Sequence, residues 1–261
     1  MFDLTKFILG AKREYIDLGS CKLPYENSPA YNWMLTEPFL DIWGKRLFNI
    51  EEYDEGPYEN DLVRLNRGDT VFDVGANIGL FSALACTLGC KVYAFEPLER
   101  NVRFLRLLKQ FNPEFDITIC QMALSDKNGT ATLYNSGDDM GGGTIKEDIH
   151  ENNEKVDKRP AVLSHTNTIT LDDFVRAKGI DRLDFIKADI EGSEVALLEG
   201  GKYAISRFKP NLSLCSYHRA TDPATLENLI SHIYSGYSIE KGKKKIYAAV
   251  KVKEFKKGEG S

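Results

Sequence analysis

A short glycine-containing loop between a strand pattern and a helix pattern constrains this chain more than any other feature. The run Thr70-Val71-Phe72-Asp73-Val74 is apolar and β-branched, as expected of a strand buried in a parallel sheet. Gly75-Ala76-Asn77-Ile78-Gly79 follows, and the residues from there to Leu88 have helical composition. Glycines here let the chain turn tightly and let a ligand approach the backbone, and asparagine tolerates left-handed geometry. The loop therefore predicts a ligand site at the carboxyl end of a parallel strand.

The segments after this loop alternate between strand and helix patterns. Residues 91–96 and 115–122 are strand patterns, and residues 98–111 between them have helical composition, with Pro97 opening the helix. Such alternation predicts parallel βαβ units in a doubly wound sheet. The dipeptide Asn128-Gly129 is typical of a tight turn and predicts a β-hairpin insertion.

Further strand patterns follow the insertion. Residues 183–188 and 211–217 are apolar runs that fit parallel strands, and residues 221–234 have a helical pattern. Residues 237–240 and 245–252 predict a closing antiparallel pair. The expected fold class is therefore α/β, with a doubly wound and mostly parallel sheet.

We divide the chain into three parts. Residues 1–66 are rich in aromatic residues and prolines, and we expect a helical and irregular extension that forms either a cap over the sheet or a lid over the site. Residues 67–252 form the main domain, and residues 253–261 form a flexible tail. Within the insertion, we expect residues 137–159 to be exposed because they are glycine-rich and then polar.

Composition narrows the function classes. The 34 Lys and Arg against 39 Asp and Glu give a net charge of −5, which argues against nucleic acid as a partner. The five cysteines show no C-x-x-C spacing, so we expect reduced thiols and a cytoplasmic protein. The sequence shows no apolar run near the roughly 18 residues that a membrane span needs.

Two acidic residues indicate the kind of ligand that the loop binds. Glu96 ends the second strand about 20 residues after the loop, where an acid can accept both ribose hydroxyls of an adenosyl group. Asp73 at the end of the first strand would oppose a diphosphate but suits a cationic ligand. The third glycine of a dinucleotide fingerprint is missing, which counts against a nucleotide-binding oxidoreductase without excluding it.

Five segments occur in the order seen in one known family. They are Phe72-Asp73-Val74-Gly75-Ala76-Asn77-Ile78-Gly79, Ala94-Phe95-Glu96-Pro97, Ala123-Leu124-Ser125-Asp126, Thr170-Leu171-Asp172-Asp173-Phe174 and Phe185-Ile186-Lys187-Ala188-Asp189-Ile190-Glu191-Gly192-Ser193-Glu194. Together they resemble the FkbM family of S-adenosylmethionine-dependent class I methyltransferases. The resemblance spans residues 60–240 or so and implies a seven-stranded sheet whose last strand is antiparallel.

The resemblance also implies where the cofactor binds. S-adenosylmethionine would bind along the loop and leave as S-adenosylhomocysteine. Glu96 would bind the ribose, and Ser125 or Asp126 would lie near the adenine. The cofactor-binding residues that the resemblance implies are Asp73, Gly75, Ala76, Asn77, Gly79, Glu96, Pro97, Ser125 and Asp126.

Polar residues after two later strands indicate the acceptor side of the site. Asp189 follows strand 183–188, at the edge of the sheet where α/β folds bind ligands, and Glu191 comes soon after it. His218 follows strand 211–217, and an ordinary pKa of about 6.5 would let it take a proton from an acceptor hydroxyl. We therefore expect Asp189, His218 and Glu191 to be the catalytic residues.

A metal ion is the alternative for the carboxylates. Asp189, Glu191 and Glu194 are ligands of the type that Mg²⁺ and Ca²⁺ prefer. No histidine joins them at a definite spacing, so we assign no metal ligand and do not favour a divalent metal.

The function that we expect is O-methylation of a hydroxyl on a sugar, a glycan or a secondary metabolite, a substrate class that rests on the resemblance alone. N-methylation of a peptide or of a small amine or amide is the nearest alternative. A nucleotide-binding oxidoreductase and a non-catalytic adenosyl-binding module are alternatives of a different class. The expected partner is a small-molecule or glycan acceptor, and a homodimer stays open.

Overall fold

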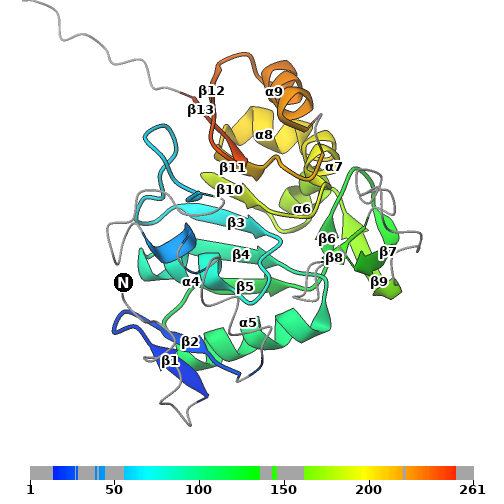
Figure 1. Cartoon of the computed structure of the whole chain (residues 1–261). Helices are drawn as coiled ribbons and strands as arrows, with labels where there is room; N and C mark the ends of the chain where they lie inside the picture. Colours follow the sequence, from blue (N-terminus) through cyan, green and yellow to red (C-terminus); the bar gives the residue numbers. More distant parts are fainter. Residues whose placement is uncertain are drawn as a thin grey trace, which may run out of the picture.

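The computed structural model describes residues 14–26, 28, 39, 41–44, 56–135, 143–145, 162–219 and 222–250. Within these residues, seven strands form one central sheet (Figure 1). In spatial order they are β12 (Tyr237–Lys241), β13 (Lys245–Val250), β11 (Asn211–Cys215), β10 (Phe185–Ala188), β3 (Thr70–Val74), β4 (Lys91–Phe95) and β5 (Ile117–Cys120). The expected tail, residues 253–261, lies outside the described residues.

The sheet is mostly parallel. Strands β11, β10, β3, β4 and β5 pair in parallel, whereas β13 pairs antiparallel with both of its neighbours, β11 and β12. Every residue of β3 and β10 is buried, as expected of parallel strands that are covered on both faces. The expected seven-stranded sheet with an antiparallel last strand is confirmed.

Helices cover both faces of this sheet (Figure 1). One face carries α4 (Leu80–Thr87) and α5 (Glu99–Phe111). The other carries α6 (Leu171–Ala177), α7 (Glu194–Glu199), α8 (Lys202–Phe208) and α9 (Asp222–Ile233). Successive side chains of a strand point to opposite faces, so Val71 packs with α4 while Phe72 packs with α6. Helix α8 was not expected, because it is only seven residues long and directly follows two glycines.

The insertion forms a second sheet with the order β6-β9-β7-β8. Its strands are β6 (Ala123–Leu124), β7 (Gly129–Asn135), β8 (Gly143–Thr144) and β9 (Val162–Ile169). β7 and β9 pair antiparallel, but β9 lies between β6 and β7, so the strands on either side of Asn128-Gly129 do not pair with each other. The Asn128 side chain instead accepts from Thr170 N and donates to Asp173, which ties this turn to the start of α6. Most of the segment 137–159 lies outside the described residues, but Thr144 within it is buried and donates to Glu191 O, so the expected exposure is wrong at this residue.

The described part of the N-terminal extension packs beside α4 and α5. Strands β1 (Tyr15–Asp17) and β2 (Lys22–Pro24) form an antiparallel pair where we expected helices and turns. Asn112, after α5, bonds both the N–H and the carbonyl of Lys22, and these side-chain contacts favour the extended form. Trp43 is buried and donates to Leu80 O of α4. The choice between a cap and a lid, and the division of the chain at residue 66, stay predictions.

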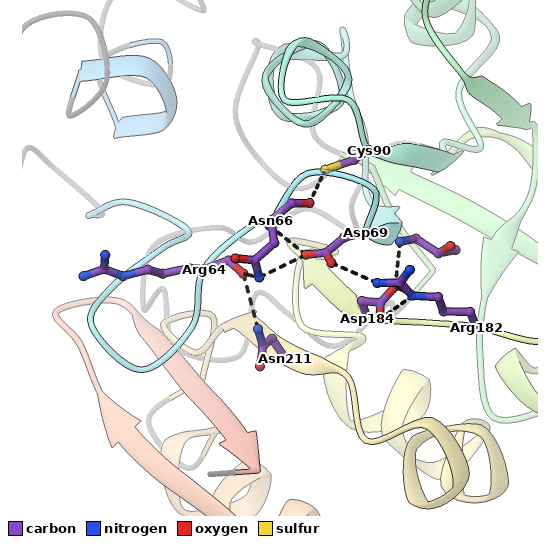
Figure 2. Close-up of polar contacts among 8 residues, drawn as sticks. Arg64, Asn66, Asp69, Cys90, Arg182, Asp184 and Asn211 are labelled. Carbon is purple, nitrogen blue, oxygen red and sulfur yellow. Dashed lines mark hydrogen bonds and ion pairs between the residues drawn. The ribbon is translucent and has the colours of Figure 1, made fainter. Parts of the chain in front are cut away.

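A network of hydrogen bonds and ion pairs connects side chains at the amino end of the sheet (Figure 2). Asp69 Oδ2 accepts from Asn66 N at 2.7 Å, and Asp69 Oδ1 lies 3.4 Å from Arg182. Asp184 accepts from Arg182 Nε at 2.8 Å and from Thr70 N at 2.8 Å. These side chains hold the starts of β3 and β10 together.

The cysteines and the described helices bear on two of the expectations from composition. All five cysteines are buried thiols outside any disulfide. Among the helices that the structure describes, none combines the length and the apolar character that crossing a membrane requires.

Candidate active site

The glycine loop lies at the carboxyl end of β3 and is fixed there by backbone contacts. The N–H groups of Gly75 and Ala76 both donate to Phe95 O at 3.0 Å, which ties the loop to the end of β4. Gly75 has a φ of 76°, and a Cβ on it would lie 1.9 Å from the carbonyl oxygen of Asp189. Only glycine fits between β3 and β10 at this point, as the sequence pattern predicts.

Asn77 and Gly79 complete the turn into α4. Asn77 has a φ of 51° and Gly79 a φ of 94°, so both are in the left-handed region. A Cβ on Gly79 would lie 2.8 Å from Leu105 of α5, which explains the second glycine. Asparagine occupies the left-handed position that its side chain tolerates best among non-glycine residues.

Glu96 follows β4 and links the loop to the start of α5. Its Oε2 accepts from Asn77 N at 2.8 Å, and its Oε1 accepts from Leu98 N at 2.9 Å. Burial raises the pKa of this carboxyl to about 7, although the two backbone N–H groups favour its ionised form. The side chain of Asn101 also donates to this carboxyl, so three of its roughly four acceptor positions are used and about one is left for a ligand hydroxyl.

Asp73 and Lys187 brace the loop from within the sheet. Asp73 is completely buried, accepts from Ser82 Oγ at 2.6 Å and lies 3.1 Å from Lys187 Nζ. Lys187 also donates to Gly75 O at 2.6 Å. Burial acts to lower the pKa of Lys187, but Asp73 and Asp189 outweigh it and raise that pKa. The direct contacts of Asp73 are therefore with protein groups, and its contact with a cofactor stays a prediction.

Four side chains meet at the carboxyl ends of β10 and β11, and we call them the acidic cluster: Asp189, Glu191, Glu194 and His218. Nδ1 of His218 lies 3.4 Å from Glu191 Oε2. Its Nε2 lies 3.8 Å from Asp189 Oδ1 and 3.6 Å from Glu194 Oε1. The fold thus brings together the three residues expected to be catalytic and adds Glu194, which is almost completely buried.

The acidic cluster changes the protonation of its members. Burial acts to lower the pKa of His218, but the three carboxylates outweigh it and raise the pKa to about 9. The ordinary pKa of about 6.5 that we expected for His218 is therefore wrong. The sequence could not indicate the shift, because no pattern in the chain shows that β10 and α7 bring carboxylates to this imidazole. Burial raises the pKa of Glu194 to about 7 despite the nearby imidazole. Burial opposes ionisation of Asp189, but His218, Lys187 and Tyr58 hold its pKa below the ordinary value.

Two local features orient this cluster. Tyr58 OH donates to Asp189 Oδ2 at 2.7 Å, so a residue of the N-terminal extension reaches the site. Glu191 has a φ of 53°, a conformation that costs a non-glycine residue about 1–2 kcal/mol and that is common at functional sites. Sequence reasoning missed Tyr58, because nothing in the aromatic-rich extension distinguishes it from its neighbours.

Ser125, Asp126 and Pro97 lie at the margins of the site. Ser125 N donates to Ile169 O of β9, and Ser125 Oγ lies 3.0 Å from Asp126 Oδ1. Pro97 comes directly before Leu98, the N-cap of α5, and so lies just outside the first helical turn that we expected it to open. Contacts of these three residues with a cofactor stay predictions.

Most of the chain matches the model of one known protein family. The family model described as the methyltransferase FkbM domain matches residues 73–239, which is more than half of the chain. The chain belongs to the FkbM methyltransferase family. Membership confirms the resemblance inferred from the five segments and removes the oxidoreductase alternative.

Individual relatives are similar over part of their length. This FkbM chain is 32% identical over 160 residues to the 31-O-demethyl-FK506 methyltransferase FkbM of Streptomyces tacrolimicus, covering 53% of this chain and 61% of that protein. It is 25% identical over 178 residues to the hexuronic acid methyltransferase AglP of Haloferax volcanii, covering 66% and 68%. It is 26% identical over 174 residues to the AMB antimetabolite synthetase AmbE of Pseudomonas aeruginosa, covering 55% of this chain but only 8% of that protein.

A solved structure has the same fold. The methyltransferase FkbM from Methylobacillus flagellatus superposes with a TM-score of 0.53 at 24% identity, covering 84% of this chain and 52% of that one. At this identity the likeness concerns the fold. The present chain thus spans about half of this structural relative and less than two thirds of two of the three curated relatives named above.

Proposed function

We propose that this FkbM chain transfers a methyl group from S-adenosylmethionine to a hydroxyl of a sugar, a glycan or a secondary metabolite. The observation that carries the proposal is the pairing of Glu96 with the loop, through Asn77 N at 2.8 Å. A carboxylate that keeps about one acceptor position for a ligand thus lies beside a loop that admits a ligand at its backbone. The names of two relatives, a 31-O-demethyl-FK506 methyltransferase and a hexuronic acid methyltransferase, support the acceptor class.

The cofactor would lie along the carboxyl ends of β3 and β4. The ribose hydroxyls would donate to Glu96, and the methionine part would lie along residues 75–79, above the buried pair of Asp73 and Lys187. This placement directs the sulfonium methyl toward β10, because the backbone at Gly75 touches that of Asp189. The adenine would lie toward β5 and Ser125.

The acceptor would lie against the acidic cluster. Its hydroxyl oxygen forms the new C–O bond while the C–S bond breaks, and the electron pair of that bond leaves with sulfur in S-adenosylhomocysteine. The hydroxyl proton passes to a carboxylate of the acidic cluster, Asp189 or Glu191, and from there to solvent, because His218, whose pKa is raised to about 9, already holds a proton near pH 7. Because the methyl group is already activated, alignment of the two reactants supplies much of the rate.

An exposed aromatic ring offers a docking surface for the acceptor. Tyr217 is 39% exposed and its ring centroid lies 4.1 Å from that of His218. Lys244 Nζ lies 5.3 Å from the same ring centroid. A tyrosine face next to a cationic group suits a sugar ring that carries hydroxyl or carboxylate groups.

Calorimetric titration tests the cofactor, and radiolabel transfer tests the reaction. S-adenosylhomocysteine should bind the full chain, NAD should not, and Glu96→Gln should weaken the first titration. Tritium from labelled S-adenosylmethionine should then appear in a hydroxylated acceptor from a panel of sugars and hexuronic acids. Binding of NAD alone would overturn the cofactor, and transfer only to amines would overturn O-methylation in favour of N-methylation.

A further inference from the structure

We propose that Asp189, Glu194 and His218 bind one divalent transition-metal ion, of the Mn²⁺ or Zn²⁺ class. Each side chain offers one ligand atom, a carboxylate oxygen or an imidazole nitrogen, and these three atoms all lie within 4.8 Å of one another. The binding of the ion rests on this geometry. Its role in catalysis rests on the proposed methyl transfer.

Two of the three proposed ligand atoms are buried and lack a hydrogen-bond partner within the described residues. Within the described residues, His218 Nε2 and Asp189 Oδ1 have no hydrogen-bond partner. The His218 side chain is only 4% exposed, and its Nε2 points between Asp189 and Glu194. Buried polar atoms without partners are rare and costly, so this pair indicates a missing ligand.

The spacing of the atoms fits a cation better than hydrogen bonds. Nε2 lies 3.8 Å from Asp189 Oδ1 and 3.6 Å from Glu194 Oε1, beyond the usual reach of an N–H···O bond. Ligand atoms about 2.0–2.2 Å from a tetrahedral zinc ion lie roughly 3.3–3.6 Å apart. Small rotations of the side chains would therefore close the three atoms around one ion.

Each proposed ligand is also held by a second group. Glu191 lies 3.4 Å from His218 Nδ1, on the far side of the ring from Nε2. Tyr58 OH donates to Asp189 Oδ2, which leaves Oδ1 for the ion. Ile190 N donates to Glu194 Oε1 at 3.0 Å. A carboxylate behind a metal-binding histidine is the usual way in which proteins fix its ring and tautomer.

The donor set indicates which ions bind. One imidazole and two carboxylates suit Mn²⁺ or Zn²⁺, whereas Mg²⁺ and Ca²⁺ prefer oxygen ligands alone. The ammonium of Lys187 is bonded to Asp73 and Gly75, so it does not occupy the centre of the cluster. Sequence reasoning did not favour a metal because no histidine lies near these carboxylates in the chain. The fold supplies His218 from the end of the next strand.

The ion would act on the acceptor. Three protein ligands leave open positions, and an acceptor hydroxyl bound there would lose its proton to solvent more readily. The resulting oxygen anion would attack the methyl carbon, and the C–S bond would break to give S-adenosylhomocysteine. The ion would therefore select hydroxylated acceptors over amines.

Titration of the metal-stripped full chain tests the proposal directly. We expect Mn²⁺ or Zn²⁺ to saturate at one ion per chain in calorimetry, with Mg²⁺ and Ca²⁺ binding more weakly. Glu191→Gln should weaken the affinity about 10- to 100-fold, as expected of a residue that acts through a ligand. Glu194→Gln and His218→Asn should weaken it further. Glu96 lies at the cofactor end of the site, so the Glu96→Gln variant should bind the ion as the wild type does.

The same samples separate this proposal from the proposed function. Each protein is also titrated with S-adenosylhomocysteine, and circular dichroism checks that each variant is folded. Cofactor binding without saturable ion binding by the wild type would overturn the metal site alone and leave a charged imidazole among carboxylates. Ion binding unchanged in folded His218→Asn would also overturn it. Ion binding without cofactor binding would support the metal site and overturn the proposed function.

Discussion

The two ends of the central sheet use similar residues for different purposes. At the amino end, Arg182 bonds to both Asp69 and Asp184, and each carboxylate also accepts from a backbone N–H, all within 3.4 Å (Figure 2). At the carboxyl end, Asp189 and His218 keep buried atoms without hydrogen-bond partners. Charged groups that satisfy each other indicate structure, whereas buried groups left unsatisfied indicate a ligand. The comparison predicts that matched substitutions at the two ends will have unequal effects.

The largest difference is expected for two basic residues. Lys187→Met leaves the fully buried Asp73 without its cation, which should cost about 3–5 kcal/mol of unfolding free energy. Arg182→Met removes a cation that is 58% exposed at the other end, and should cost about 0–1 kcal/mol. Urea unfolding of both variants measures the two costs. Equal costs would contradict the difference in burial between these two ion pairs, on which this prediction rests.

Two glycines with similar backbone angles sharpen the comparison. Gly75→Ala should cost about 1–3 kcal/mol from overpacking in addition to strain, and should abolish cofactor binding, because its Cβ meets Asp189 O. A Cβ added at Gly68 would meet no atom within 4 Å, and Gly68 has a φ of 83°. Gly68→Ala should therefore cost only the backbone strain of about 1–2 kcal/mol. Thermal unfolding and S-adenosylhomocysteine titration measure both effects. Normal cofactor affinity in Gly75→Ala would remove the loop from the site.

A pH dependence should arise from Glu96. Its pKa is raised to about 7 by burial, and the proposed ribose contact uses the ionised form. Affinity for S-adenosylhomocysteine should therefore rise with pH, by about tenfold between pH 6 and pH 8, and then level off. Calorimetry across this range measures the change, and Glu96→Gln should show weaker binding with little pH dependence. A wild-type affinity that falls as pH rises would contradict the assignment.

The smallest effect is expected at two exposed tyrosines. Tyr217→Ala should raise the acceptor KM roughly two- to tenfold, the loss expected for one aromatic contact, without changing cofactor affinity. Tyr203→Ala on α8 removes a similarly exposed ring away from the acidic cluster and should leave the acceptor KM unchanged. Initial rates at varied acceptor concentration compare the two. Similar KM changes in both variants would argue against the docking surface.

Local patterns were enough to predict most of the fold and the geometry of the glycine loop. Gly75 and Asn77 lie where a strand turns into a helix, and such turns constrain residue type through backbone geometry alone. Glu96 was predictable because its distance from the loop follows from one βαβ unit. The insertion was harder, because the side chain of Asn128 bonds to α6 and β9 enters between β6 and β7.

Long-range contacts explain what the sequence could not predict. Tyr58 bonds Asp189 across the fold, and nothing in the residues around it shows this partner. The raised pKa of His218 and its place beside Glu194 depend on how β10, α7 and β11 meet. The sequence therefore predicts which residues lie at the strand ends. The distances between them and their protonation states can be seen only once the fold is known.

Hydrogen–deuterium exchange with and without S-adenosylhomocysteine tests most directly the claim that the carboxyl end of the sheet is the ligand site. We predict slower exchange at the backbone amides of residues 75–79 and of Glu96 and Leu98 when the ligand is present, with no change at residues 66–70 and 182–184. Protection confined to the amino-end residues, or no protection anywhere at saturating ligand, would contradict the account.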